Sequence, residues 1–240
     1  MKYFKPSLNS NYLQSGGSKE TVRIGLTDQG DKDCKDNKTA FKLMNGMLPR
    51  SQKILMEQVH GSAIKTIDIK KEVSSQFCCP KADGVYIKNT LKNRGLILGV
   101  RLADCMAVFV LKNGQLKGAF HAGWRGVVKN IAGKFSNIFT PSDRNLLEFF
   151  VSPHICENCF VVSKEIYQQF PDQAGCGMIS KDKGKISLYK GLRQQLICTG
   201  VKKENINFMI NDNYCTLENS KFHSHRRGDR ERMLAFAIQP

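Results

Sequence analysis

Residues 101–126 read R-L-A-D-C-M-A-V-F-V-L-K-N-G-Q-L-K-G-A-F-H-A-G-W-R-G. They contain two short apolar runs, 106–111 and 116–120, which predict buried strands. Between the runs, Asn113-Gly114 is a dipeptide typical of a type I′ turn, so the strands should form an antiparallel hairpin. Cys105 comes just before the first strand and His121 just after the second. Because a hairpin brings its two ends together, we expect this thiol and this imidazole to be neighbours.

A helix is predicted directly after the hairpin. Apolar residues recur there at spacings of three and four, at positions 127, 128, 131, 135 and 138, which is the period of a helix. Gly123, Arg125 and Gly126 lie at its expected start. Free backbone N–H groups at a helix N-terminus attract anions, and an arginine adds positive charge. Arg125 and Gly126 are therefore candidate phosphate-binding residues.

The composition indicates a globular chain. With 240 residues, of which 41% are hydrophobic, the chain can bury a sizeable core, and we expect one domain over residues 1–240. Residues 1–20 are polar and rich in serine, glycine and asparagine, so we expect a loosely ordered start. The sequence shows neither a secretory leader nor an apolar run of the roughly 20 residues that a membrane span needs. We therefore expect a cytoplasmic protein without membrane contact.

Charge and cysteine content argue against two broad classes of protein. A formal net charge of +16 suits a nucleic-acid-binding protein. However, the basic residues are spread along the whole chain and are not interleaved with aromatic residues that would stack on bases. We do not expect nucleic-acid binding. The nine cysteines are odd in number and scattered, unlike a disulfide framework, so we expect free thiols apart from metal ligands.

The rest of the chain predicts short strands mixed with helices. Strands are expected at 22–26, 54–59, 63–69, 85–87, 96–102, 208–210 and 233–238. Helices are expected at 37–47, capped by Asp36, and at 165–170 and 189–198. This mixture predicts an α+β or mixed α/β fold with a substantially antiparallel sheet.

Three residues at expected strand ends form a candidate metal site: His60, Cys105 and His121. Two imidazoles and one thiolate suit Zn²⁺, and three protein ligands leave a fourth position open for water or substrate. A trigonal His₂Cys set also binds copper with an axial methionine, although Met106 should point to the other face of its strand. Without metal, Cys105 and His121 would suit a nucleophile and its general base. From spacing alone these alternatives stay open.

Other polar residues each allow two interpretations. Asp83 is either a turn residue or a site carboxylate. Arg226 and Arg227 are either surface charges or partners of a bound phosphate or carboxylate.

A second cysteine motif lies further along the chain. His154, Cys156 and Cys159 form H-x-C-x-x-C, which resembles half of a structural zinc site. Such sites bring together two matched pairs of ligands. The nearest other pair, His223-x-His225, is far away in sequence, so we do not predict a second metal here.

Several motifs resemble the signatures of the laccase-domain family. In chain order they are Gln58-Val59-His60-Gly61, Ala82-Asp83-Gly84, Ala103-Asp104-Cys105, His121-Ala122-Gly123-Trp124-Arg125-Gly126, Asp212-x-x-Cys215-Thr216 and Ser224-x-Arg226-Arg227. The match covers most of the chain from about Asn37 onward. This family was first called multicopper polyphenol oxidase and is generally described as a purine nucleoside phosphorylase family that includes a bacterial peptidoglycan editing factor.

The resemblance implies a fold, a cofactor and an activity. The implied fold is a mixed β-sandwich flanked by helices, similar to the catalytic domain of cytotoxic necrotizing factors. The implied cofactor is zinc on His60, Cys105 and His121, with copper as the alternative. The implied reactions are phosphorolysis of adenosine, inosine, guanosine and methylthioadenosine to base and ribose 1-phosphate, and deamination of adenosine. Asp83 and Asp104 are candidates for orienting ligands or moving protons.

Three positions depart from the family pattern. Val161 stands where glutamate is expected, Leu192 where asparagine is expected and His225 where tyrosine is expected. These departures affect the expected pocket walls and leave the metal ligands intact. They keep open a second hypothesis, in which the protein is a Cys/His hydrolase that edits peptidoglycan precursors. With copper in place of zinc, the alternative function is that of a laccase-like polyphenol oxidase. In either case we expect a monomer or homodimer.

Overall fold

The computed structural model describes residues 22–69, 77–89, 95–170, 184–210 and 214–240. Its strands are β1 (Arg23–Leu26), β2 (Gln52–Leu55), β3 (Ile64–Asp68), β4 (Phe77–Cys78), β5 (Gly84–Asn89), β6 (Leu96–Leu102), β7 (Met106–Lys112), β8 (Gln115–Ala122), β9 (Leu147–Val151), β10 (Ile206–Phe208) and β11 (Met233–Gln239). Its helices are α1 (Asn37–Met47), α3 (Trp124–Val128), α4 (Ile131–Ser136), α5 (Pro141–Arg144), α6 (Lys164–Tyr167), α7 (Leu188–Cys198) and the 3₁₀ helix η1 (Lys203–Asn205). The expected loose start at residues 1–20 lies outside the described residues.

The strands form two mixed sheets. The five-stranded sheet has the order β1-β11-β6-β2-β4. Its pairs on the β1 side are antiparallel, whereas β6, β2 and β4 run parallel. The six-stranded sheet has the order β10-β9-β7-β8-β5-β3, with three antiparallel pairs in its middle and a parallel pair at each edge. The predicted α+β class is confirmed.

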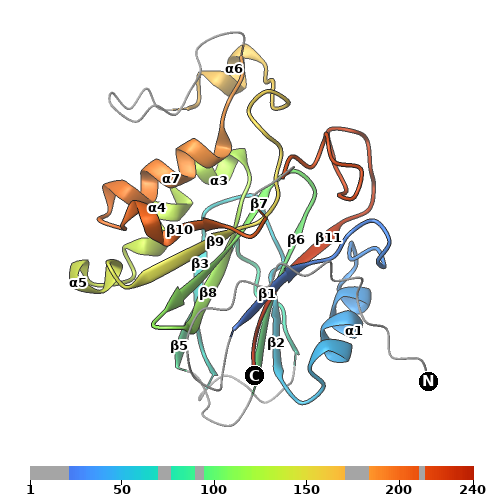
Figure 1. Cartoon of the computed structure of the whole chain (residues 1–240), viewed down its shortest axis with the longest axis vertical. Coiled ribbons are helices and arrows are strands. Elements are labelled where there is room, and N and C mark those ends of the chain that lie inside the picture. The colour runs from blue at the N-terminus through green and yellow to red at the C-terminus, as the bar shows by residue number, and fades with distance from the viewer. Residues whose placement is uncertain (1–21, 70–76, 90–94, 171–183, 211–213) are drawn as a thin grey trace.

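The two sheets share one core and carry helices on their outer sides (Figure 1). A buried cluster joins both sheets, with Leu98 and Val100 contributed by β6 and Phe109 by β7. On the other side of the six-stranded sheet, a second cluster includes residues of α3, α4 and α7. A third cluster joins the five-stranded sheet to α1. Apolar packing therefore holds the two sheets together. The side chains of the segments that connect the sheets are available to form a functional site.

The predicted hairpin is β7-β8. Asn113 and Gly114 at its turn have φ values of 52° and 72°, as a type I′ turn requires. The register pairs Met106 with Ala122 and Ala107 with His121. His121 therefore lies inside β8, one residue before the end of the strand, and not just after it as predicted.

The helix predicted after the hairpin is two short helices. The first, α3, begins at Trp124, earlier than the apolar pattern indicates, and ends at Val128. Asn130 then adopts a left-handed conformation with φ of 57°, and its side chain accepts a hydrogen bond from the backbone N–H of Gly133 to cap α4. An asparagine tolerates this conformation and ends one helix while starting the next.

The strand predicted before His60 also differs from the structure. The strand expected at 54–59 is shorter, because β2 ends at Leu55. Val59 is 44% exposed, and His60 has a φ of 56°. His60 thus lies in the loop after the strand. Strand β9, the buried run Leu147–Val151, was not predicted.

Helix α1 has the bounds and the cap that the sequence predicts. The Asp36 carboxylate accepts hydrogen bonds from the Thr39 backbone N–H and from the Thr39 hydroxyl, both at 2.8 Å. Replacing Asp36 with alanine should lower the midpoint of thermal unfolding by about 2–4 °C, because helix α1, which packs on the five-stranded sheet, loses its N-cap. Circular dichroism melts would measure the shift, and Asp36→Asn, which keeps the acceptor, should recover most of it.

Candidate active site

His60, Cys105 and His121 lie close together where the chain passes from one sheet to the other. His60 lies in the loop between β2 and β3, Cys105 in the turn between β6 and β7, and His121 in β8. Both connections pass from the five-stranded to the six-stranded sheet. One ligand atom of each residue lies within 4.8 Å of the other two. The imidazole rings meet edge to face, with their centroids 5.0 Å apart.

A buried carboxylate stands behind this group. Asp83 has no exposed surface. Its Oδ1 accepts a hydrogen bond from the His60 backbone N–H at 2.9 Å and lies 3.0 Å from Nδ1 of His121. Its Oδ2 accepts from the Gly61 N–H at 2.6 Å. Because Nδ1 of His121 is paired with Asp83, Nε2 is the nitrogen left to face the cluster. Asp83 also fixes the loop that carries His60.

The electrostatics of this group favour the thiolate form of Cys105 and the imidazolium form of His121. Burial opposes the thiolate of Cys105, but the charge and hydrogen bonds of His121 and a hydrogen bond of His60 outweigh it and lower the pKa of Cys105 to about 6. Burial likewise opposes the imidazolium of His121, but Cys105 and Asp83 raise the pKa of His121 to about 9. The pKa of Asp83 is held below its ordinary value, because hydrogen bonds from His121, Gly61 and His60 overcome its burial. These shifts favour the pairing of a Cys105 thiolate with a His121 imidazolium.

Two glycines allow α3 to lie close to the cluster. A Cβ atom on Gly123 would lie 2.9 Å from Sγ of Cys105. A Cβ atom on Gly126 would lie 3.2 Å from the carbonyl oxygen of Gly61, in the His60 loop. Gly126 is buried, whereas Arg125 is exposed and places its guanidinium 4.3 Å from the centroid of the Trp124 ring. Sequence reasoning did not anticipate the contact of Gly123 with Cys105, because only the folded geometry shows it.

Asp104, the residue before Cys105, is tied to two distant segments. It has a φ of 78°. Its Oδ1 accepts from the Thr216 hydroxyl at 2.6 Å, and its Oδ2 accepts from the Arg226 backbone N–H at 2.7 Å. These contacts hold the β6–β7 turn, which carries Cys105, against the C-terminal loops.

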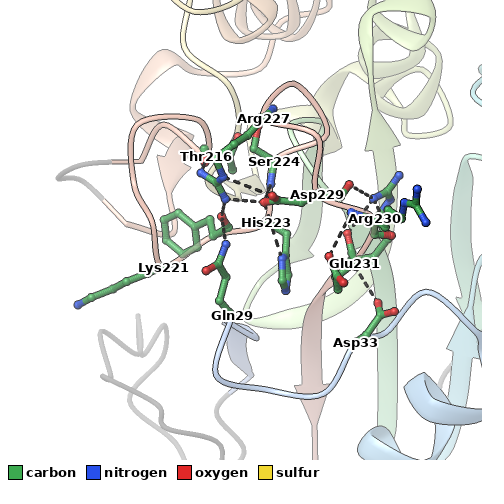
Figure 2. A network of polar contacts seen from close by, with 12 residues as sticks. Gln29, Asp33, Thr216, Lys221, His223, Ser224, Arg227, Asp229, Arg230 and Glu231 are labelled. Atoms are coloured by element: carbon green, nitrogen blue, oxygen red, sulfur yellow. Dashed lines mark hydrogen bonds and ion pairs between the residues drawn. The ribbon is translucent and has the colours of Figure 1, made fainter.

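The two arginines near the C-terminus differ in their surroundings. The Arg226 side chain donates to the Val161 carbonyl at 2.8 Å and lies over the Phe160 ring. Arg227 pairs with Asp229 and donates to backbone carbonyl oxygens of its own loop, as Figure 2 shows. The Arg227 guanidinium thus braces the loop, and its predicted contact with phosphate stays a prediction.

The three departures from the family pattern fall in different environments. Leu192 is fully buried in the core cluster beside α3 and α4. Val161 is 45% exposed, and His225 is also exposed. Leu192 is therefore a packing residue, and the two exposed positions are free to contact a ligand.

The family is established by comparison with known proteins. A family model described as "Multi-copper polyphenol oxidoreductase laccase" matches residues 16–239. The chain belongs to this family. The chain is also similar to "Purine nucleoside phosphorylase YfiH" of Escherichia coli, 31% identical over 76% of this chain and 71% of that protein. "Purine nucleoside phosphorylase RC0672" of Rickettsia conorii is 34% identical over 49% of this chain and 45% of its own length. "Adenosine deaminase RL5", from an unknown prokaryotic organism, is 28% identical over 56% of this chain and 54% of its own length.

A solved structure shows the same fold. The crystal structure of YlmD from Geobacillus stearothermophilus superposes with a TM-score of 0.72 at 21% identity, covering 95% of this chain and 99% of that one. Among the described residues of our chain, no helix is long and apolar enough to cross a membrane. Every described cysteine carries a free thiol, whereas Cys176 lies outside the described residues.

Proposed function

We propose that the protein is a zinc-dependent purine nucleoside phosphorylase that also deaminates adenosine. The observation that carries this proposal is the convergence of His60, Cys105 and His121 in front of the buried carboxylate of Asp83. The proposed substrates are adenosine, inosine, guanosine and methylthioadenosine, which phosphate would convert to base and ribose 1-phosphate. The activities named for the relatives support this choice.

The residues present fit a zinc ion. Two imidazoles and a thiolate are donors that Zn²⁺ prefers, and three ligands leave one position open. Metal-binding histidines commonly donate their other ring N–H to a carboxylate, and the pairing of His121 with Asp83 has this form. When bound, zinc would act as a Lewis acid and lower the pKa of a water molecule at the open position.

Copper is a weaker fit than zinc. A blue-copper site adds a weak axial methionine to its two imidazoles and thiolate. Met106, the neighbour of Cys105, is fully buried in the core cluster that contacts α3 and α4. Its side chain packs in the core, which supports zinc.

The chain's own residues supply positioning and charge for the reaction. Asp83 orients the His121 ring and anchors the His60 loop. Arg125, exposed and stacked on Trp124, is our candidate for binding phosphate, together with its neighbour in sequence, Gly126. Arg226 and Arg227 remain further candidates at the C-terminal loops, and Asp104 is proposed to position Cys105.

The test is a phosphate-dependent assay. Purified protein is incubated with adenosine or inosine and phosphate, and free base and inosine are quantified by chromatography. We expect base to appear only with phosphate, and Cys105→Ala to lose at least about 100-fold of this activity because a metal ligand is gone. Cys198→Ser, which changes an exposed thiol on α7, is the matched control and should keep it. Zinc bound stoichiometrically without any release of base would contradict the proposal.

A Cys/His hydrolase is the second candidate function. The observation that favours it is the chain of contacts from Cys105 through His121 to Asp83, which is the order of nucleophile, base and orienting carboxylate. Its substrate would be a wrong amide or ester bond in a peptidoglycan precursor, and its fold would be related to that of cytotoxic necrotizing factors. A metal chelator separates the two candidates, because the dyad would keep its activity and the zinc enzyme would lose it.

The remaining expectations are also proposals. We propose that residues 1–240 form one domain, that the protein works in the cytoplasm as a monomer or homodimer, and that it does not act on nucleic acid.

A further inference from the structure

We propose a second metal site, structural in character, formed by Cys156, Cys159, Cys215 and Glu218. Its occupant would be a thiophilic divalent cation such as Zn²⁺. One ligand atom of each residue lies within 4.8 Å of the others. This group is separate from the candidate active site and does not depend on the proposed function.

Each half of the site is a tight turn with two ligands three positions apart. In the first turn, the N–H groups of Cys159 and Phe160 donate to the Cys156 carbonyl at 3.2 and 2.9 Å. In the second, the Asn219 N–H donates to the Cys215 carbonyl at 2.9 Å. Structural zinc sites are built from such pairs, one from each of two turns. The second pair, which the spacing of cysteines and histidines in the sequence does not reveal, is Cys215-x-x-Glu218, and it ends in a carboxylate.

Contacts between the turns already bring the ligands together. The Cys156 backbone N–H points at Sγ of Cys215, 3.4 Å away, and Sγ of Cys159 lies 3.2 Å from Oε1 of Glu218. Cys215 is buried, and the exposed Glu218 closes the outer side.

The histidine of the H-x-C-x-x-C motif is not a ligand. His154 is 2% exposed, and its Nδ1 faces the Ser152 carbonyl at 2.9 Å. Its ring stacks against Phe208 and packs on Tyr214. His154 is therefore a core residue. Three thiolates and one carboxylate complete a four-coordinate shell without it, and such a closed shell leaves no position for substrate.

The position of the site indicates what it stabilises. The residues next to two of the ligands, Ile155 and Thr216, both donate hydrogen bonds to Asp104, at 3.0 Å to its carbonyl and 2.6 Å to its carboxylate. Asp104 precedes Cys105 in the active-site turn. A metal that joins the two turns would thus lock the loops that hold this turn in place.

The experiment measures zinc in the full-length Cys105→Ala protein, which removes the first site. By elemental analysis and by competition with a chromogenic chelator, this protein should bind about one equivalent of zinc. Adding Cys159→Ser or Cys215→Ser should weaken binding at least about 100-fold, and adding Glu218→Gln about 10-fold. Adding Cys198→Ser should change nothing, because this thiol lies on α7 outside the cluster.

A second readout, cadmium absorption, tests the thiolate ligands without changing any cysteine of the proposed cluster. Cadmium bound to the Cys105→Ala protein should give the ultraviolet absorption of cadmium–thiolate bonds, which Glu218→Gln keeps. Zinc should also raise the melting temperature of Cys105→Ala and not of Cys105→Ala/Cys159→Ser. The proposal is overturned if Cys105→Ala binds no zinc, if Cys159→Ser leaves its affinity unchanged, or if mass analysis finds a disulfide among these cysteines in freshly reduced and re-purified protein.

Discussion

Replacing Asp83 with alanine is expected to lower the free energy of unfolding by about 3–5 kcal/mol and activity by about 100-fold. The change leaves the backbone N–H groups of His60 and Gly61 and the Nδ1 of His121 without their common acceptor. The buried Nδ1 of His121 pays the full cost of desolvation when it loses its partner, whereas the partly buried N–H groups of His60 and Gly61 pay only part of it. The His60 loop and the His121 ring would both be released, so the affinity for the proposed zinc ion should fall together with the activity.

Urea unfolding, zinc content and the phosphorolysis assay together measure these effects. Asp143→Ala is the matched control, because it breaks a surface ion pair with Lys112 far from the cluster and should leave all three close to wild type. Asp83→Asn should give an intermediate result. The asparagine amide has one acceptor oxygen, so it can accept only some of the hydrogen bonds that the two carboxylate oxygens accept. Wild-type activity and zinc content in Asp83→Ala would show that the carboxylate does not position the histidines.

Replacing Gly118 with alanine is expected to cost about 3 kcal/mol of unfolding free energy, at the upper end for overpacked sites. A Cβ atom at this position in β8 would lie 2.3 Å from the carbonyl oxygen of Val85 and 2.6 Å from Cζ of Phe135. The Val85 oxygen belongs to the backbone of the neighbouring strand β5, so it cannot rotate away. Strand β8 must shift instead, and His121 is three residues further along it.

The control is a glycine with open space around it. Apart from its chain neighbours and the adjacent backbone of helix α1, no atom lies within 4 Å of a Cβ atom on Gly46. Gly46→Ala should therefore stabilise the protein by about 0.5–1 kcal/mol, because alanine is the better helix former. Equal unfolding midpoints for Gly118→Ala and the wild type would contradict the close contact of β8 with β5 and α4. We also expect Gly118→Ala to bind less zinc.

Local patterns were sufficient to predict most strands and helices. The hairpin turn at Asn113-Gly114 and the cap at Asp36 are examples, because each depends on the chemistry of two or three adjacent residues. The helix after the hairpin was predicted as one because its apolar period continues through residue 130. The left-handed backbone of Asn130 divides this segment into two helices. The presence of an asparagine in a sequence is not enough to predict that conformation.

The residues of the candidate sites likewise fall into those that a local motif predicts and those that depend on distant contacts. His60, Cys105 and His121 were found because each lies in a distinctive motif, and the hairpin placed two of them together. The second cluster was missed because its halves are 56 residues apart, from Cys159 to Cys215, and one half ends in a glutamate. The role of Asp104 depends on contacts with Thr216 and Arg226, more than a hundred residues away. No short pattern carries such information.

The position of β11 has a consequence for how the chain reaches this structure. In the five-stranded sheet, β11 lies between β1 and β6, and it pairs residue 238 with residue 23. Contacts between such distant segments slow folding, because a long loop must close before they form. While the chain is being synthesised, β1 and β6 have no partner on their facing edges until β11 has been made. Unpaired edges invite pairing with other chains, so newly made copies are most exposed to aggregation in the interval before β11 docks.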